Sequence, residues 1–395
     1  MPPLSLLIKP ASSGCNLRCS YCFYRSLASS RAVEDYGRMP YSILEIIVKK
    51  ALRYADPACT FMFQGGEPTL AGLEFYQKLI EYQNKYNENN IRIHNAIQTN
   101  GTLLDACWAE FFAVNRFLVG LSLDGDKLIH DRNRTDIEKH GSFTRVMKAA
   151  ACLTRAGVEF NTLTVVTKAS AKHPVKMYNF FKKNGFHHLQ FIPCLSPLHQ
   201  TQQNASQSPT PEGYLQFLKT LFDLWYLDIQ RGEKISIRYF DNLIRMVSGY
   251  PPESCGLTGV CTCQFVMEAD GSVYPCDFYA GDEWRLGSLS KDSFSDLLSS
   301  PRCLKFIEES VKCHEDCLTC KWRKVCGGGC KRDRDCSGKN YYCPCYYAFF
   351  EYSLPRIHDL LLNPTCPPRS RPSLHNRDNG SSAKDHREPP RYPVQ

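Results

Sequence analysis

Hydrophobic and polar positions divide the first half of the chain into two kinds of segment. Short apolar or β-branched runs end in polar or glycine-rich residues, and a stretch with helical periodicity follows each of the first five. The predicted strands cover residues 4–9, 59–63, 91–97, 117–123, 159–166 and 188–192. The predicted helices cover residues 41–54, 73–86, 104–114, 143–156 and 174–184.

Strands that alternate with helices are typical of parallel βαβ units with right-handed crossovers. Six strands are fewer than the eight of a closed TIM barrel, so the pattern predicts an α/β fold with a partial (β/α)6 TIM-like barrel. We expect this barrel over residues 1–230 and a cysteine-rich domain over 231–362. Residues 363–395 are rich in Pro and Arg with little apolar periodicity, which predicts a disordered tail.

Composition narrows the class of protein. The chain has 395 residues, enough for two or three domains, and its 21 cysteines in a long chain without a secretory signature favour metal binding in a reducing compartment. Part of the net charge of +8 comes from the tail, and no basic groove with interleaved aromatics indicates nucleic-acid binding. No apolar run is long enough for a signal peptide or a membrane span. We predict a cytoplasmic protein that binds neither nucleic acid nor membrane.

Three cysteines after the first strand carry the first chemical signal. Cys15, Cys19 and Cys22 have the spacing C-x3-C-x2-C. Three thiolates can hold three irons of a four-iron cluster and leave the fourth iron open to a ligand. An open metal position is where a protein does chemistry.

This run, with Tyr21 before the third cysteine, resembles the cluster motif of the radical S-adenosylmethionine (SAM) enzymes, in which the open iron binds SAM. A Gly-Gly pair after a strand is usually only a turn. Together with the cysteine loop, however, Gly65-Gly66-Glu67-Pro68 resembles the GGEP element of that family, whose backbone meets the methionine ammonium group. The resemblance covers about residues 4–230 and implies SAM contacts at Tyr21, Gly65, Gly66, Glu67, Ser122, Arg134 and Leu195.

The second half carries eight further cysteines, spaced Cys255-x5-Cys261-x14-Cys276 and Cys317-x2-Cys320-x5-Cys326-x3-Cys330-x12-Cys343. Spacing alone fits structural zinc as well as iron–sulfur clusters. After a radical SAM domain, the pattern resembles the SPASM extension, which carries two auxiliary four-iron clusters. The resemblance implies that the first is held by Cys255, Cys261, Cys276 and Cys330, and the second by Cys317, Cys320, Cys326 and Cys343. Five nearby cysteines are expected to be bystanders, of which Cys263 and Cys345 compete most closely for a ligand role: Cys263, Cys303, Cys313, Cys336 and Cys345.

The segments 5–17, 64–72, 261–265 and 270–279 resemble the anaerobic sulfatase-maturating enzymes, and the similarity extends from residue 1 to about residue 362. The resemblance implies three 4Fe-4S clusters, SAM, and oxidation of a Cys or Ser in a Cys/Ser-x-Pro-x-Arg motif to Cα-formylglycine. Asp277 is the candidate proton acceptor, and Tyr24 and Gln64 are candidates for the substrate side. The implied partners are a sulfatase polypeptide, bound as an unfolded segment, and a low-potential electron donor such as a flavodoxin or ferredoxin.

Two alternatives stay open at this point. Another SPASM enzyme, one that forms thioether or carbon–carbon links in peptides, would share the cysteines and the SAM motifs, although such enzymes usually carry a leader-peptide-binding segment. A non-catalytic iron–sulfur electron carrier or a zinc scaffold would not need the Gly65-Gly66-Glu67 loop.

Overall fold

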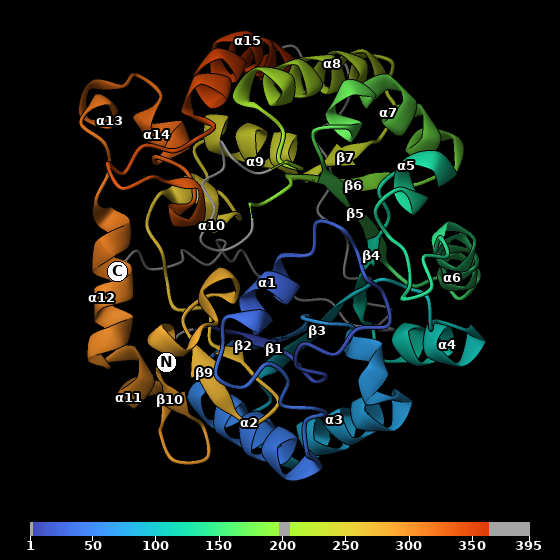
Figure 1. Cartoon of the computed structure of the whole chain (residues 1–395), viewed down its shortest axis with the longest axis vertical. Coiled ribbons are helices and arrows are strands. Elements are labelled where there is room, and N and C mark those ends of the chain that lie inside the picture. Colours follow the sequence, from blue (N-terminus) through green and yellow to red (C-terminus); the bar gives the residue numbers. More distant parts are fainter. Residues whose placement is uncertain (1–2, 197–205, 363–395) are drawn as a thin grey trace, which may run out of the picture.

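The computed structural model describes residues 3–196 and 206–362. Its centre is a sheet in which six parallel strands pair in sequence order: β1 (Leu4–Ile8), β2 (Ala58–Phe63), β3 (Arg92–Thr99), β4 (Leu118–Ser122), β5 (Phe160–Val166) and β6 (His188–Pro193). The helices around this sheet are α2 (Tyr41–Tyr54), α3 (Leu73–Tyr86), α4 (Ala106–Val114), α6 (Phe143–Arg155), α7 (Pro174–Lys183) and α8 (Pro211–Gln230) (Figure 1). The predicted partial barrel is confirmed.

The side chains of β2 show why these strands form. Cys59, Phe61 and Phe63 are fully buried in the core that α2 and α3 share with the sheet, whereas Thr60 and Met62 between them are only partly buried. Successive residues of a strand point to opposite faces. One face of the sheet therefore builds the core with the helices, and the other lines the interior of the barrel.

The two shorter helices of the barrel lie in loops at the carboxyl ends of strands. These are α1 (Phe23–Ser29), which follows the cysteine loop after β1, and α5 (Lys127–Asp131), which follows β4. Figure 1 shows α1 in the middle of the molecule rather than in the outer layer of helices.

Four short strands that the sequence pattern did not predict extend the sheet at both ends. The strand β7 (Ser236–Ile237) pairs in parallel with β6, and β8 (Val266–Met267) pairs in parallel with β1. The strands β9 (Ser272–Tyr274) and β10 (Gly287–Ser288) continue from β8 in antiparallel pairing. The C-terminal part of the chain is thereby attached to both edges of the barrel.

The rest of the C-terminal part is helical. Its helices are α9 (Arg238–Val247), α10 (Cys255–Thr258), α11 (Phe294–Leu298), α12 (Pro301–Val311), α13 (Asp316–Thr319), α14 (Arg323–Cys326) and α15 (Cys343–Leu362). The long helix α15 packs on α8 and α9, where Phe222, Phe240 and Phe349 join one aromatic cluster (Figure 1). Of the eight predicted ligands in this part, Cys255, Cys317 and Cys326 lie in helices of four residues and Cys343 begins α15, whereas the other four lie outside α-helices.

Within the described ranges, no helix has both the length and the apolar character that crossing a membrane requires. The tail predicted over residues 363–395 lies outside the described residues.

Candidate active site

The cysteine loop lies between β1 and α1, at the carboxyl end of the first strand. It borders a cavity of 730 Å³ whose lining includes Cys15, Arg18 and Arg25. Burial raises the pKa of Cys15 to about 12 and the pKa of Cys19 to about 11. Both thiols are therefore protonated at neutral pH unless a metal supplies compensating positive charge, as it does for any coordinating thiol. Three cysteines in one partly buried loop fit an iron–sulfur cluster with one open iron.

The glycine turn after β2 packs directly against this cysteine loop. Gly66 has a φ of +54°, and a Cβ added to it would stand 2.2 Å from the backbone oxygen of Gly14. The backbone nitrogen of Glu67 donates to that same oxygen at 2.7 Å. Only glycine allows both the backbone angle and the close approach. The turn and the loop thus form one unit.

The side chain of Glu67 is buried and used within the protein. Its Oε1 accepts hydrogen bonds from the nitrogen and the hydroxyl of Thr69 (3.0 and 2.6 Å) and from the hydroxyl of Thr99 (2.6 Å). Its Oε2 accepts from the backbone nitrogen of Asn100 at 2.7 Å. Burial raises the pKa of Glu67. The carboxyl group therefore ties the glycine turn to the end of β3, and any contact of this residue with SAM falls to its backbone.

We expect Glu67→Gln to lower the free energy of unfolding by about 1–3 kcal/mol, because an amide nitrogen facing these donors leaves at least one buried group unpaired. Denaturant unfolding of the purified protein measures this. Glu81→Gln is the matched control, since Glu81 is exposed and pairs only with Lys78 in a surface ion pair, and it should change stability by less than about 0.5 kcal/mol. Equal stability of the two variants would contradict this role of Glu67.

Arg134 and Tyr21, both predicted to contact SAM, meet at Asp124. The Nε and Nη2 atoms of Arg134 donate to the two Asp124 oxygens at 3.0 and 3.1 Å, and the Tyr21 hydroxyl donates to Asp124 Oδ2. The Arg134 guanidinium also lies 5.4 Å from the centre of the Tyr21 ring. Both side chains thus have partners inside the protein, which the motif did not predict.

The remaining two predicted SAM contacts lie at strand ends. Ser122 ends β4, and its hydroxyl accepts a hydrogen bond from Gln98 at 3.1 Å. Leu195 follows β6 and is partly buried. Ser122 and Leu195, like Gly65 and Gly66, therefore lie at the carboxyl ends of the strands, where parallel barrels bind their ligands.

Asp277 is buried and lies in a compact polar group with the two substrate-side candidates. The Tyr24 hydroxyl donates to Asp277 Oδ2, and Gln64 Nε2 donates to the same oxygen at 3.2 Å and to the Tyr24 oxygen at 2.7 Å. Burial raises the pKa of Tyr24 well above its ordinary value, and the neighbouring Asp277 adds to the shift. Tyr24 therefore stays a hydrogen-bond donor to Asp277.

Three residues that the sequence analysis missed complete this group. Lys9 Nζ lies 3.3 Å from Asp277 Oδ1 and 3.4 Å from Glu268 Oε1, and Arg31 Nη1 lies 2.5 Å from the same Glu268 oxygen. Burial acts to raise the pKa of Glu268, but the charges of Lys9 and Arg31 outweigh it and hold this pKa below its usual range. The sequence did contain a signal for a role of Lys9, because a lysine directly follows a mostly apolar strand. No such signal marks Glu268, because its partners Lys9 and Arg31 lie far away in the sequence.

The four cysteines predicted for the first auxiliary cluster come together. Burial raises the pKa of Cys330 to about 12, and Asp333, Cys255 and Cys261 add to this shift. Burial likewise raises the pKa of Cys276 well above its usual range, with further contributions from Cys330 and Cys255. The four thiols are thus close enough to interact electrostatically.

The four cysteines predicted for the second cluster form a separate group. Burial raises the pKa of Cys326 to about 11, and Cys343, Cys317 and Cys320 each add to the shift. Cys313 also acts on Cys317, so this bystander lies beside the group.

The two bystanders that compete most closely for a ligand role have other surroundings. The thiol of Cys263 hydrogen-bonds with that of Cys303. Cys345 is buried in the aromatic core near Tyr342 and Phe349.

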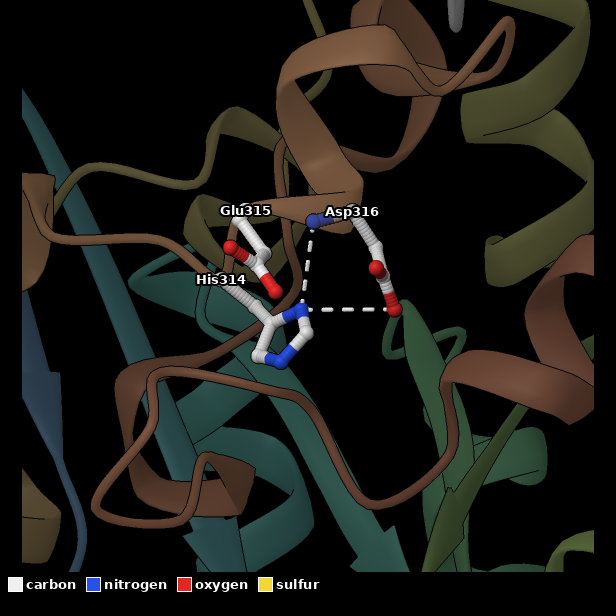
Figure 2. A group of neighbouring side chains, drawn as sticks. All are labelled: His314, Glu315 and Asp316. Atoms are coloured by element: carbon white, nitrogen blue, oxygen red, sulfur yellow. Dashed lines mark hydrogen bonds and ion pairs between the residues drawn. The ribbon is translucent and has the colours of Figure 1, made fainter.

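In the part of the chain that the structure describes, one group of His, Cys, Asp and Glu has ligand atoms within 4.8 Å of one another: His314, Glu315 and Asp316. Figure 2 shows that they are consecutive residues, with His314 Nδ1 next to the backbone nitrogen and carboxylate of Asp316. Both acidic residues are exposed. Local turn contacts explain this group, and we assign it no metal.

Comparison with known proteins matches both parts of the chain. Residues 10–181 match the Radical SAM superfamily, and residues 255–321 match SPASM, an iron-sulfur cluster-binding domain. The chain is 51% identical to a cysteine-type anaerobic sulfatase-maturating enzyme of Clostridium perfringens, over 92% of this chain and 100% of the relative. It is 32% identical to a serine-type enzyme of Bacteroides thetaiotaomicron, over 89% and 90% of the two chains.

A solved structure has the same fold. It is described as native anSMEcpe with bound AdoMet, another abbreviation for SAM, and the Kp18Cys peptide. The similarity covers 91% of this chain and 99% of that chain, with 50% sequence identity and a TM-score of 0.87.

Proposed function

Because this chain belongs to the anaerobic sulfatase-maturating enzymes of the radical SAM superfamily, we propose that it oxidises a cysteine in a Cys-x-Pro-x-Arg segment of a sulfatase to Cα-formylglycine. The observation that carries the proposal is the position of Asp277. This acid comes from the C-terminal part of the chain, yet it is buried against Tyr24 beside the cysteine loop and against Gln64 after β2. The cysteine-type relative is also more similar to this chain than the serine-type relative.

Each implied cofactor has a set of residues that fits it. We propose that Cys15, Cys19 and Cys22 hold the SAM-binding cluster and that the backbone of Gly65, Gly66 and Glu67 contacts SAM. The two groups of four cysteines are proposed to hold the auxiliary clusters, as the sequence predicts. When bound, SAM and its cluster supply the radical that removes a hydrogen atom from the substrate Cβ, and an auxiliary cluster supplies an acceptor for one further electron.

Residues of this chain accept the proton that leaves the Sγ atom of the substrate cysteine. The substrate cysteine loses one hydrogen atom from Cβ, one proton from Sγ and one electron, which together give a thioaldehyde that water converts to the aldehyde and hydrogen sulfide. The Asp277 carboxylate accepts the Sγ proton. Hydrogen bonds from Tyr24 and Gln64 to Oδ2 orient it, and Oδ1, which accepts no hydrogen bond within the described residues, lies 3.3 Å from Lys9 Nζ. Burial of the whole group excludes water from the radical.

We also propose the domain limits 1–230 and 231–362 and a low-potential electron donor such as a flavodoxin or ferredoxin. The α8 helix ends at Gln230, which supports the first limit. The cysteines of the described residues are free of disulfides, in keeping with the predicted reducing, cytoplasmic compartment.

The test is anaerobic incubation of the reconstituted protein with SAM, dithionite and a Cys-x-Pro-x-Arg peptide, followed by mass spectrometry. We expect formylglycine together with 5′-deoxyadenosine. The matched Ser-x-Pro-x-Arg peptide should react at least about tenfold more slowly, a difference of about 1.4 kcal/mol in the barrier. Deoxyadenosine with an unchanged peptide would point to another peptide modification, such as crosslinking. If protein with all its clusters loaded formed neither formylglycine nor 5′-deoxyadenosine, the proposed enzymatic function would be contradicted.

A further inference from the structure

Arg334 lies between the two groups of auxiliary cysteines and is held entirely by backbone oxygens. All five of its N–H donors are used. Nε donates to Gly328 (3.2 Å), Nη1 to Ser310 (2.6 Å) and Lys312 (3.0 Å), and Nη2 to Gly259 (2.8 Å) and Gly329 (2.7 Å).

These acceptors belong to the segments that carry the cysteines of both groups. Gly259 stands between Cys255 and Cys261, and the pair Gly328 and Gly329 stands between Cys326 and Cys330. Ser310 lies in the last turn of α12 and Lys312 directly follows the helix, shortly before Cys317. One guanidinium therefore joins three segments.

The packing at this junction leaves no room for larger residues. A Cβ added to Gly259, whose φ is +75°, would stand 1.8 Å from the backbone oxygen of Gly327. The loops of the two groups thus touch through their backbones, and the side chain of Arg334 fixes this contact from one side.

The charge of Arg334 is not neutralised by an ion pair. Among the ion pairs of residues 3–196 and 206–362, none includes Arg334, because its partners are neutral carbonyl groups. The neighbouring Lys331 differs, since its ammonium pairs with Glu309 at 2.8 Å and lies 4.5–5.0 Å from three aromatic ring centres, those of Tyr279, Trp284 and Phe306.

The charge of Arg334 lies beside loops of both cysteine groups. Gly259, which accepts from Nη2, is two residues from Cys261 of the first group. Gly328, which accepts from Nε, is two residues from Cys326 of the second group and two residues from Cys330 of the first.

We propose that Arg334 is a positioning residue shared by the two auxiliary clusters: it fixes the loops that carry their ligands, and its charge raises the reduction potential of both. The proposal rests on the cluster ligands proposed above. Reduction adds one negative charge to a cluster, and a nearby unpaired cation in a partly buried site stabilises that charge. Clusters with raised potentials accept the electron that the oxidation of the substrate releases.

The test compares Arg334→Gln, which removes the charge, with Arg334→Lys, which keeps the charge but has fewer donors. Both are made in the full chain with Cys15, Cys19 and Cys22 replaced by alanine, so that only auxiliary clusters remain. The readouts are iron content and the midpoint potentials from an EPR-monitored redox titration. Arg302→Gln is the matched control, because Arg302 is exposed and donates to one backbone carbonyl, that of Arg285, in the same domain.

We expect Arg334→Gln to lower both potentials by at least about 59 mV, a tenfold change in the ratio of oxidised to reduced cluster. Arg334→Lys and Arg302→Gln should keep both potentials close to those of the parent. Full iron content with unchanged potentials in Arg334→Gln would overturn the proposal.

A second comparison applies if Arg334→Gln fails to bind its clusters. Loaded clusters in Arg334→Lys would then support the role of the charge. Loss of iron in both variants would show that Arg334 acts only by positioning the loops, which would overturn the role of its charge. Failure of the parent to bind two clusters would instead contradict the proposed ligands, so the two failures are distinguishable.

Discussion

Cys15→Ala is expected to abolish SAM cleavage, with a loss of at least about 100-fold in 5′-deoxyadenosine. Loss of an outer-shell partner alone costs a metal site about 10- to 100-fold, and here a direct ligand of the cluster is lost. The remaining thiols, Cys19 and Cys22, cannot hold three irons, and the burial of Cys19 makes its thiolate costly without the metal. The measurement is deoxyadenosine formed with SAM and dithionite, quantified by mass spectrometry without peptide.

The control for this variant is Cys107→Ala. Cys107 is exposed on α4 and belongs to none of the three predicted ligand sets, so cleavage should match that of the unsubstituted protein. Iron analysis accompanies both variants, with the auxiliary iron expected to remain. Deoxyadenosine at the normal rate from Cys15→Ala would overturn the assignment of the N-terminal cluster.

The sequence predicted the barrel closely because its elements are long enough to show periodicity. The predicted helices over residues 41–54 and 73–86 coincide with α2 and α3, and all six predicted strands are present within a few residues. The strands β7 to β10 were missed because two or three residues contain no readable alternation. Their positions depend on pairing with β6 and β1, which is decided by packing across the whole chain.

In the candidate site, too, local motifs were predicted from the sequence and contacts between distant residues were not. Cysteine spacing marks the ligand loops locally, but the division of the later cysteines into two interleaved groups came only from the family resemblance. The motif likewise indicated Arg134 as a ligand contact without showing that Asp124 occupies two of its donors. The pairing of Lys9 with Glu268 joins residues 259 positions apart in the sequence, and no local pattern indicates it.

Asp277→Asn is expected to lower formylglycine formation by about 10²- to 10⁴-fold, the usual contribution of a positioned general base. Asparagine has the same shape and can still accept hydrogen bonds from Tyr24 and Gln64, but it cannot take a proton. Lys9 keeps its second partner, Glu268, so the group retains a carboxylate for this buried cation. SAM cleavage should persist, since Asp277 is not among the proposed SAM contacts. The measurement is the ratio of formylglycine to 5′-deoxyadenosine after incubation with the Cys-x-Pro-x-Arg peptide.

This ratio separates a role in the reaction from damage to the fold. Asp359→Asn makes the same chemical change at an exposed position on α15 and should leave the ratio unchanged. A parallel fall of both products in Asp277→Asn would indicate that the substitution disturbs the neighbouring ligand Cys276 rather than proton transfer. An undiminished ratio would remove Asp277 as the base. Tyr24 could not hide the loss of Asp277 by taking its place, because burial raises the pKa of Tyr24 well above its ordinary value and keeps its hydroxyl protonated.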